Sequence, residues 1–155
     1  MRAPRLKNFD YKGYIAYSIT ICCDYKNNYF KSEIVINKCS EILKELSEKF
    51  NFKIYLYTFM PDHLHLCVVG ESKNSDLIKL IKLFKQMAGH WFKNEYHKKL
   101  FQPGYYDHII RKEEGIEKVM RYIAENPIRQ GLVGNYDEFK FTGSFMFDDT
   151  KNLFV

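Results

Sequence analysis

The chain has 155 residues and a formal net charge of +5, with a sequence pI near 8.9. This length fits one domain, and the balance of 46% hydrophobic and 28% charged residues is typical of a soluble globular protein. No stretch approaches the roughly 20 apolar residues that a membrane span needs, and no apolar run follows the basic N-terminus as in a signal peptide. The charge is consistent with a phosphate-bearing partner but does not establish one.

The four cysteines show neither a C-x-x-C pair nor the spacing of a disulfide framework: Cys22, Cys23, Cys39 and Cys67. We therefore expect a reduced, cytoplasmic protein. The chain contains no internal repeat, low-complexity tract or linker. We expect a single domain over residues 1–155, with a basic N-terminal arm at 1–12 and a tail at 136–155 that matches no clear pattern.

The first half of the chain predicts a helix flanked by strands. Residues 14–22 are rich in β-branched and aromatic side chains and predict a strand. Ser32 can cap a helix that runs to about residue 50. Residues 53–60 and 63–69 predict two further strands, and the turn at Pro61 between them indicates a hairpin.

The second half continues with a long helix, capped by Ser75 and running to about Tyr96, and a short strand at 105–111. A third helix is expected over 116–126, ended by Pro127. The tail has room for a last short strand. On the long helix, the residues expected to face the core are Ile78, Ile81, Phe84, Ala88 and Trp91. The order β-α-β-β-α-β-α predicts an α+β fold, an antiparallel sheet with helices packed on it, ferredoxin-like in outline.

The segment His63-Leu64-His65 is the sharpest local feature. Residues two apart on a strand point to the same side, so Leu64 can enter the core while both imidazoles emerge together. Two neutral imidazoles side by side form half of a metal site. A pair of histidines on a sheet face is, however, more often structural when no other ligand accompanies it.

Tyr122 and Asn126 are four residues apart on the last helix and share one of its faces. Two histidine nitrogens and an amide oxygen would give three neutral ligands, which leave the charge of a divalent ion available to a phosphodiester. A tyrosine hydroxyl beside that ion could act as a nucleophile. The four residues together therefore predict a phosphoryl-transfer site. Taken alone, Tyr122 would be a boundary residue and Asn126 a helix-ending one.

Three segments resemble those of a known family. Residues 60–66 (MPDHLHL) resemble the HUH motif region of single-tyrosine transposases, and residues 122–133 (YIAENPIRQGLV) closely resemble the signature of the REP-associated tyrosine transposases. Residues 101–111 are similar to the stretch that precedes the last helix in that group. The resemblance covers about residues 1–135.

The resemblance implies an HUH single-tyrosine DNA endonuclease and strand transferase of a bacterial or archaeal cell. Tyr122 would form a 5′-phosphotyrosine, and His63, His65 and Asn126 would hold Mg²⁺ or Mn²⁺. The partner would be single-stranded DNA, often with a hairpin such as a REP palindrome. The protein would act as a monomer or a homodimer.

Several basic residues are candidates for contact with DNA, because a groove for single-stranded DNA needs cations along the backbone. They are Arg2, Arg5, Lys85, His108, Arg111 and Arg129. His108 could also assist proton movement. Each could equally belong to an ordinary solvated surface or, for His108, to a strand edge.

Other functions remain open on the sequence alone. A ferredoxin-like domain could bind single strands without chemistry, with exposed aromatic residues stacked on bases. An HUH replication initiator or relaxase is a further alternative, although such enzymes tend to be larger. A two-histidine RNA phosphoesterase would need a second H-x-[ST] or H-x-H motif, which the chain lacks.

Overall fold

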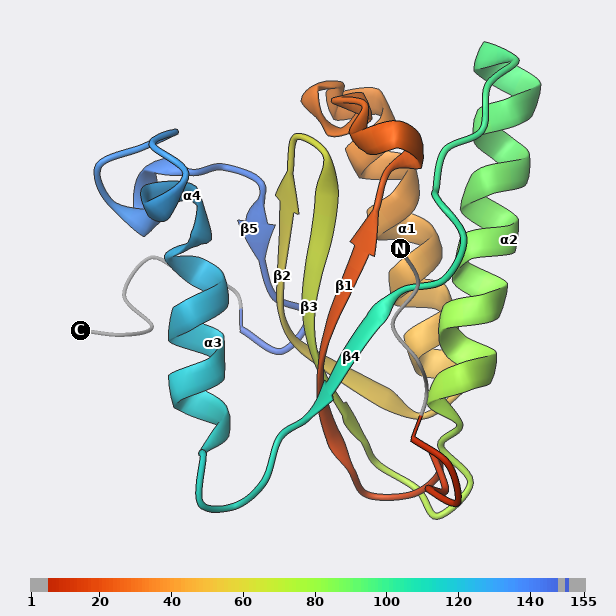
Figure 1. Cartoon of the computed structure of the whole chain (residues 1–155), viewed down its shortest axis with the longest axis vertical. Helices are drawn as coiled ribbons and strands as arrows, with labels where there is room; N and C mark the ends of the chain where they lie inside the picture. Colours follow the sequence, from red (N-terminus) through yellow and green to blue (C-terminus); the bar gives the residue numbers. More distant parts are fainter. Residues whose placement is uncertain (1–5, 148–149, 151–155) are drawn as a thin grey trace.

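The computed structural model describes residues 6–147 and residue 150. Its centre is an antiparallel five-stranded sheet with the strand order β4-β1-β3-β2-β5 (Figure 1). The strands are β1 (Ala16–Cys22), β2 (Phe52–Met60), β3 (His63–Gly70), β4 (Tyr106–Ile109) and β5 (Thr142–Gly143). The predicted hairpin is confirmed, since β2 and β3 pair from Met60↔His63 to Phe52↔Gly70. The last short strand expected in the tail is β5.

Helices cover both faces of the sheet (Figure 1). The long helices α1 (Glu33–Lys49) and α2 (Leu77–Tyr96) pack together on one face, and α3 (Ile116–Ala124) lies on the other, followed by the short α4 (Asn126–Arg129). Single 3-10 turns lie at Asp24–Lys26, Tyr29–Lys31 and Tyr136–Glu138. The predicted α+β class is confirmed, and the order of β4-β1-β3-β2 is the one expected of a ferredoxin-like sheet.

The two faces have separate hydrophobic clusters. The larger cluster joins α1 and α2 to inward residues of the sheet such as Ile19, Leu64 and Leu66. The smaller cluster joins α3 to Leu56 and Cys67 on the other face. Because successive strand residues point to opposite sides, one strand supplies both clusters. On α2, Ile81, Phe84 and Ala88 are buried and Trp91 is partly buried, as predicted. Ile78 is exposed instead, because it lies about 100° around the helix from the buried Leu77.

The helix caps differ in one place from the prediction. Ser32 caps α1 as expected, and its hydroxyl accepts a hydrogen bond from the Val35 amide at 3.4 Å. The cap of α2 is Asp76 rather than Ser75, and its carboxylate accepts from the Lys79 amide at 3.2 Å. Ser75 is buried and donates its hydroxyl to the Asn51 carbonyl at 2.7 Å. It therefore links the start of α2 to the loop before β2.

The prediction that Pro127 ends the last helix is wrong. The helix α3 stops earlier, at Ala124, and Glu125 keeps a right-handed helical conformation (φ −85°, ψ −3°) that leads into α4. Pro127 lies in the first turn of α4, where its missing amide hydrogen is not needed. The chain therefore continues helically past the proline, which places Arg129 two turns beyond Tyr122.

The part of the chain that the structure describes contains no helix both long and apolar enough to cross a membrane.

Candidate active site

The side chains of His63 and His65 lie on the face of the sheet that α3 covers. Their neighbours in the chain, Leu64 and Leu66, are fully buried on the other face. The two imidazole rings are 4.6 Å apart between centroids and nearly perpendicular. The strand alternation expected from the sequence thus brings both rings together at the start of β3.

Hydrogen bonds orient both imidazoles through the same ring atom. Nδ1 of His63 lies 2.6 Å from Oδ1 of Asp62, and Nδ1 of His65 lies 3.0 Å from the hydroxyl of Thr20 on β1. A proton on each Nδ1 leaves each Nε2 lone pair available to a ligand. The hairpin turn is held in place as well, because the Cys23 amide donates to the Asp62 carbonyl and the Phe30 amide to that of Pro61.

The environment of His65 favours the neutral ring. Burial, together with the nearby His63 and Arg129, lowers the pKa of His65 to about 3. A neutral imidazole can donate a lone pair to a metal ion, whereas a protonated one cannot.

Asn126, at the start of α4, adds a carboxamide to the histidine pair. Its carboxamide Nδ2 lies 3.3 Å from Nε2 of His63, across a sequence separation of 63 residues. Asn126 is only 5% exposed. The residues that the structure describes contain no group of three or more His, Cys, Asp or Glu side chains able to hold a metal ion, so the third ligand expected from the sequence is this amide. A rotation of the carboxamide presents its oxygen instead of its nitrogen to the space beside the imidazole.

Tyr122 lies near the C-terminal end of α3 and is 62% exposed. The guanidinium carbon of Arg129 lies 3.8 Å from the centre of its ring, a stacked cation–π contact. The same guanidinium is close enough to His65 to contribute to the lowered pKa of that ring. Arg129 therefore links the tyrosine to the histidine pair. The sequence predicted that Tyr122 and Asn126 share one helix face, but the tyrosine is exposed and the amide is buried.

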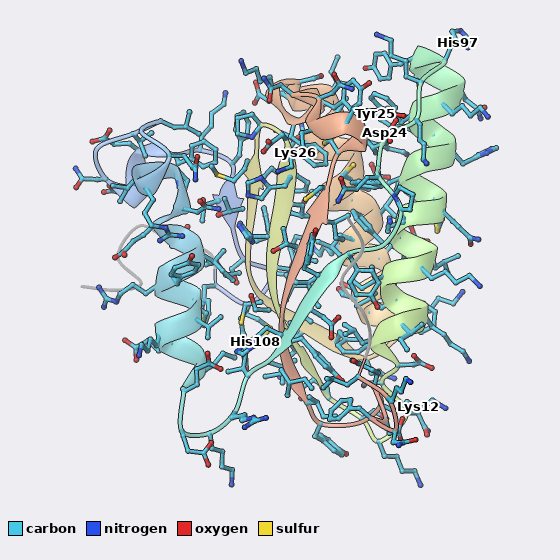
Figure 2. All side chains as sticks on the ribbon, viewed as in Figure 1. Lys12, Asp24, Tyr25, Lys26, His97 and His108 are labelled. Atoms are coloured by element: carbon cyan, nitrogen blue, oxygen red, sulfur yellow. The ribbon has the colours of Figure 1, made fainter. Side chains whose placement is uncertain are left out.

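A pocket of about 350 Å³ lies beside Tyr122, and its other lining residues are Ser18, His108, Glu114, Lys118 and Val119. His108 is on β4 (Figure 2), and its Nε2 lies 2.8 and 2.9 Å from the two carboxylate oxygens of Glu114. This contact lowers the pKa of Glu114. The candidate DNA contact at His108 is thus next to the predicted nucleophile and has a carboxylate partner.

The remaining basic candidates have different surroundings. The ammonium of Lys85 donates to the carbonyls of Gln102 (2.8 Å) and Gly104 (2.6 Å), which ties α2 to the segment before β4. Arg111 is exposed just after β4. Arg2 and Arg5 lie outside the described residues. The contacts of all four with DNA stay predictions.

Two residues of the site were missed in the sequence. Asp62 directly precedes the first histidine, and a carboxylate beside a potential ligand imidazole is a common orienting partner, so its position was a usable signal. Thr20 offered no such signal, because its contact with His65 depends on the pairing register of β1 with β3.

Comparison with solved structures supports the fold. A REP-associated tyrosine transposase bound to a REP hairpin superposes with a TM-score of 0.79 at 18% identity, covering 99% of this chain and 89% of that one. A putative transposase from Deinococcus radiodurans is similar over 78% of this chain and 95% of its own, with a TM-score of 0.54 and 15% identity.

Sequence comparison identifies the family. An uncharacterized protein of Haemophilus influenzae is 26% identical, over 82% of this chain and 88% of its own length. Residues 12–126 match the family model described as "Transposase IS200 like". This match extends from the residues before β1 to the candidate ligand Asn126, and it confirms the family resemblance inferred from the sequence. The chain belongs to the IS200-like transposase family.

Proposed function

We propose that this protein is a single-tyrosine HUH endonuclease and strand transferase that cuts single-stranded DNA with Tyr122. The observation that carries the proposal is the contact between Asn126 and Nε2 of His63, because it joins the histidine pair to the helical segment that bears the tyrosine. The membership in a transposase family supports the same chemistry.

The proposed metal ligands are His63, His65 and Asn126, and the ion would be Mg²⁺ or Mn²⁺. The donor set can hold a divalent ion, because both rings are held through Nδ1 and His65 is neutral at physiological pH. The amide oxygen of Asn126 is the kind of donor that suits Mg²⁺ or Mn²⁺. When bound, the ion would supply Lewis-acid polarisation of a phosphate oxygen. The three side chains are uncharged, so they leave the charge of the ion for the phosphodiester.

In the proposed cleavage step, the hydroxyl oxygen of Tyr122 attacks the scissile phosphorus and gives up its proton. A new O–P bond forms on the tyrosine, the bond from phosphorus to the 3′ oxygen breaks, and that oxygen takes up a proton. The products are a 5′-phosphotyrosine and a free 3′-hydroxyl. Arg129 would hold the ring of Tyr122 in place and offer a cation to the phosphate, since its guanidinium stacks on that ring.

The same chemistry is reversible. One phosphodiester is exchanged for another, so a 3′-hydroxyl can attack the phosphotyrosine, re-form a DNA strand and release Tyr122. The exposure of Tyr122 suits this reaction, because a DNA end must be able to reach the tyrosine after the cut. Strand transfer needs this property, whereas simple hydrolysis does not.

We further propose that the substrate carries a hairpin next to the cleaved single strand and that the protein belongs to the REP-associated branch. The solved structure that shares this fold over 99% of the chain contains a REP hairpin. Residues 122–133, which resemble the signature of that branch, comprise the end of α3, the whole of α4 and the four residues that follow it. The family's insertion-sequence members typically carry Gln where Asn126 stands, which also favours this branch.

The test is a search for the covalent adduct. The protein is incubated with Mn²⁺ and single-stranded oligonucleotides that carry a hairpin and a label on the 3′ side of candidate cleavage sites, and labelled protein is resolved under denaturing conditions. Wild type should form an adduct that EDTA prevents. Tyr122→Phe should form none, because it lacks the attacking oxygen.

Tyr14→Phe is the matched control, since Tyr14 is also strongly exposed and precedes β1, at the end of that strand opposite the pairing with His63. Its adduct should equal that of wild type. Binding of the oligonucleotide by wild type without any adduct, over a panel of hairpin sequences, would reject the enzyme and favour the alternative of a non-catalytic single-strand binding module. An adduct that persists in Tyr122→Phe would reject the assigned nucleophile.

A further inference from the structure

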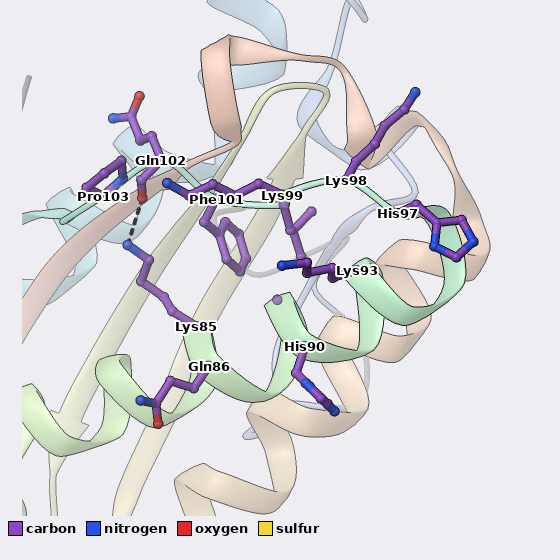
Figure 3. Close-up of a pocket in the computed structure, with 12 residues that line it drawn as sticks. Lys85, Gln86, His90, Lys93, His97, Lys98, Lys99, Phe101, Gln102 and Pro103 are labelled. Atoms are coloured by element: carbon purple, nitrogen blue, oxygen red, sulfur yellow. Dashed lines mark hydrogen bonds between the residues drawn. The ribbon is translucent and has the colours of Figure 1, made fainter.

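A basic groove lies between the second half of α2 and the segment that connects α2 to β4 (Figure 3). Its volume is about 650 Å³. The cationic and histidine residues that line it are Lys85, His90, Lys93, His97, Lys98 and Lys99. Among the described residues that line the groove, none is acidic. The groove therefore offers concentrated positive charge on both walls, which suits a polyanion.

The connecting segment forms a fixed wall of this groove. Lys85 binds the carbonyls of Gln102 and Gly104 from α2, and Figure 3 shows the first of these bonds. The side chains of Leu100 and Phe101 are buried in the main core. The groove thus exists before any partner binds, so little conformational entropy would be lost on binding.

The same segment connects the groove to the proposed active site. The Gln102 amide donates to the Cys22 carbonyl at 3.1 Å, and Phe101 forms a β-bridge with Cys23 at the end of β1. Cys22 pairs in turn with His63 on β3. The backbones of Gln102 and His63 are two strand spacings apart, roughly 10 Å. Because α2 and the two imidazoles lie on opposite faces of the sheet, a partner would have to pass around the end of β1 beside Gln102 to reach both. An extended polymer could do so, whereas a small anion could not.

Gly89 keeps the groove open on the α2 side. A Cβ atom on Gly89 would meet no heavy atom within 4 Å, so the packing of the protein does not require a glycine here. Glycine inside a helix is unfavourable relative to alanine. The residue lines the groove, and its missing side chain leaves room there for a ligand.

We propose that this groove binds the sugar–phosphate backbone of the DNA substrate on one flank of the cleavage site. The assignment of DNA as the polyanion rests on the proposed function. The anionic backbone matches the charge of Lys93, Lys98 and Lys99. The wall segment at Gln102 lies beside the end of β1, around which the DNA would reach His63. Contacts with phosphates would position the strand without reading its sequence.

Binding is measured by fluorescence anisotropy in EDTA, so that cleavage does not contribute. The probe is a labelled oligonucleotide with a hairpin and a single-stranded extension, titrated at several salt concentrations. Lys93→Gln/Lys99→Gln should weaken binding about tenfold at moderate salt. It should also lower the slope of log K against log [salt] by about 1.4 to 1.8, the value for two lost phosphate contacts. The matched control is Lys79→Gln/Lys82→Gln, which removes the same charge from exposed positions of the same helix outside the groove.

A second pair of variants separates binding from folding. Gly89→Ala and Gly89→Glu should both raise the melting temperature, because either residue is a better helix former than glycine. Only Gly89→Glu should weaken DNA binding, since it fills the groove with a negatively charged side chain.

Several results would overturn the proposal that the groove binds DNA. One is an unchanged affinity and salt slope in Lys93→Gln/Lys99→Gln; another is an equal effect in the Lys79/Lys82 control. A third is competition by inorganic phosphate as effective as by an oligonucleotide of equal phosphate concentration, which would indicate a small-anion site. An absent Tyr122 adduct in all proteins would instead reject the proposed function, because the EDTA binding data do not depend on cleavage.

Discussion

The two faces of the sheet use the same strands for different purposes. On the side of α1 and α2, alternate residues of β3 such as Leu64 and Leu66 are fully buried in the larger cluster. On the side of α3, the residues between them are His63, His65 and Cys67, and only the last belongs to a hydrophobic cluster. The larger cluster therefore stabilises the sheet while the other face can carry polar groups.

Polar side chains on the face that α3 covers line up across neighbouring strands. Tyr106, Thr20, His65, Thr58 and Thr142 form one row through the pairing registers of all five strands. Within this row the Thr20 hydroxyl contacts His65, and the hydroxyls of Thr58 and Thr142 lie 2.6 Å apart. The comparison teaches that stability and chemistry can be altered separately on β3, at neighbouring residues.

The largest effect on activity is expected for His63→Ala. It removes a proposed ligand and little core volume, so adduct formation should fall about a thousandfold or more, as expected when metal-based charge stabilisation is lost. The free energy of unfolding, measured by urea denaturation, should change by no more than about 1 kcal/mol. Widespread unfolding of His63→Ala would show that the histidine has a structural role.

The largest effect on stability is expected one residue away. Leu64 is fully buried, so Leu64→Ala should lower the free energy of unfolding by about 2 to 5 kcal/mol. Folded Leu64→Ala, at a temperature where it is still native, should retain adduct formation within about tenfold of wild type. Equal losses of stability in Leu64→Ala and His63→Ala would abolish the distinction between the two faces.

Substitutions of Asn126 test whether this buried residue acts as a metal ligand or only in packing. Asn126→Gln keeps an amide oxygen on a longer side chain and should retain some activity, whereas Asn126→Ala should form no detectable adduct. The longer side chain must fit a buried position, which should cost about 1 to 3 kcal/mol of stability. Complete inactivity of Asn126→Gln with Mn²⁺ still bound, by calorimetry, would contradict a simple ligand role.

The orienting carboxylate should have an intermediate effect. Asp62→Asn keeps the shape of the side chain that contacts Nδ1 of His63 but removes its charge. Loss of such a partner should weaken Mn²⁺ binding by about 10- to 100-fold. Calorimetric titration with Mn²⁺ measures the change, and Asp76→Asn, at the cap of α2, is a control for the loss of one carboxylate. An unchanged affinity in Asp62→Asn would leave His63 oriented by the backbone alone.

The smallest effect is expected for Arg129→Lys. The lysine keeps the positive charge but loses the planar stacking on Tyr122, a contact worth about 0.5 to 1 kcal/mol at an exposed site. The rate of adduct formation at saturating DNA should fall by a factor of roughly two to five. Arg129→Gln should lose more, because the cation is removed too. Identical rates in Arg129→Lys and Arg129→Gln would exclude a role for the charge.

The sequence predicted the placement of the two histidine side chains better than the contacts around them. The alternation of His63, Leu64 and His65 suffices to place both imidazoles on one side of a strand, and the structure bears this out. The hairpin and the long helices followed from turn residues and apolar spacing in the same way. These features depend on the residues within one short segment, so the sequence of that segment is enough to predict them.

Features that depend on tertiary contacts could not be read in advance. Pro127 is a helix breaker in the middle of a helix but is tolerated in a first turn, and only the end of α3 at Ala124 decides which case applies. The approach of Asn126 to His63 and the contact of Thr20 with His65 join residues 63 and 45 positions apart. Both require the packing of α3 and the pairing of β1, which no short window of sequence contains.

The proposed ligands come from two parts of the chain that separate motions could pull apart. The histidines belong to the central strand of the sheet, while Asn126 and Tyr122 belong to a short helical pair that is packed through the smaller cluster. Partial opening of this helical pair, detectable as early amide exchange in residues 116–129 while β3 stays protected, would disassemble the ligand set without global unfolding. An ion bound by all three ligands would then stabilise the contact between the helical pair and the sheet. Added Mn²⁺ should therefore slow amide exchange first in residues 116–129.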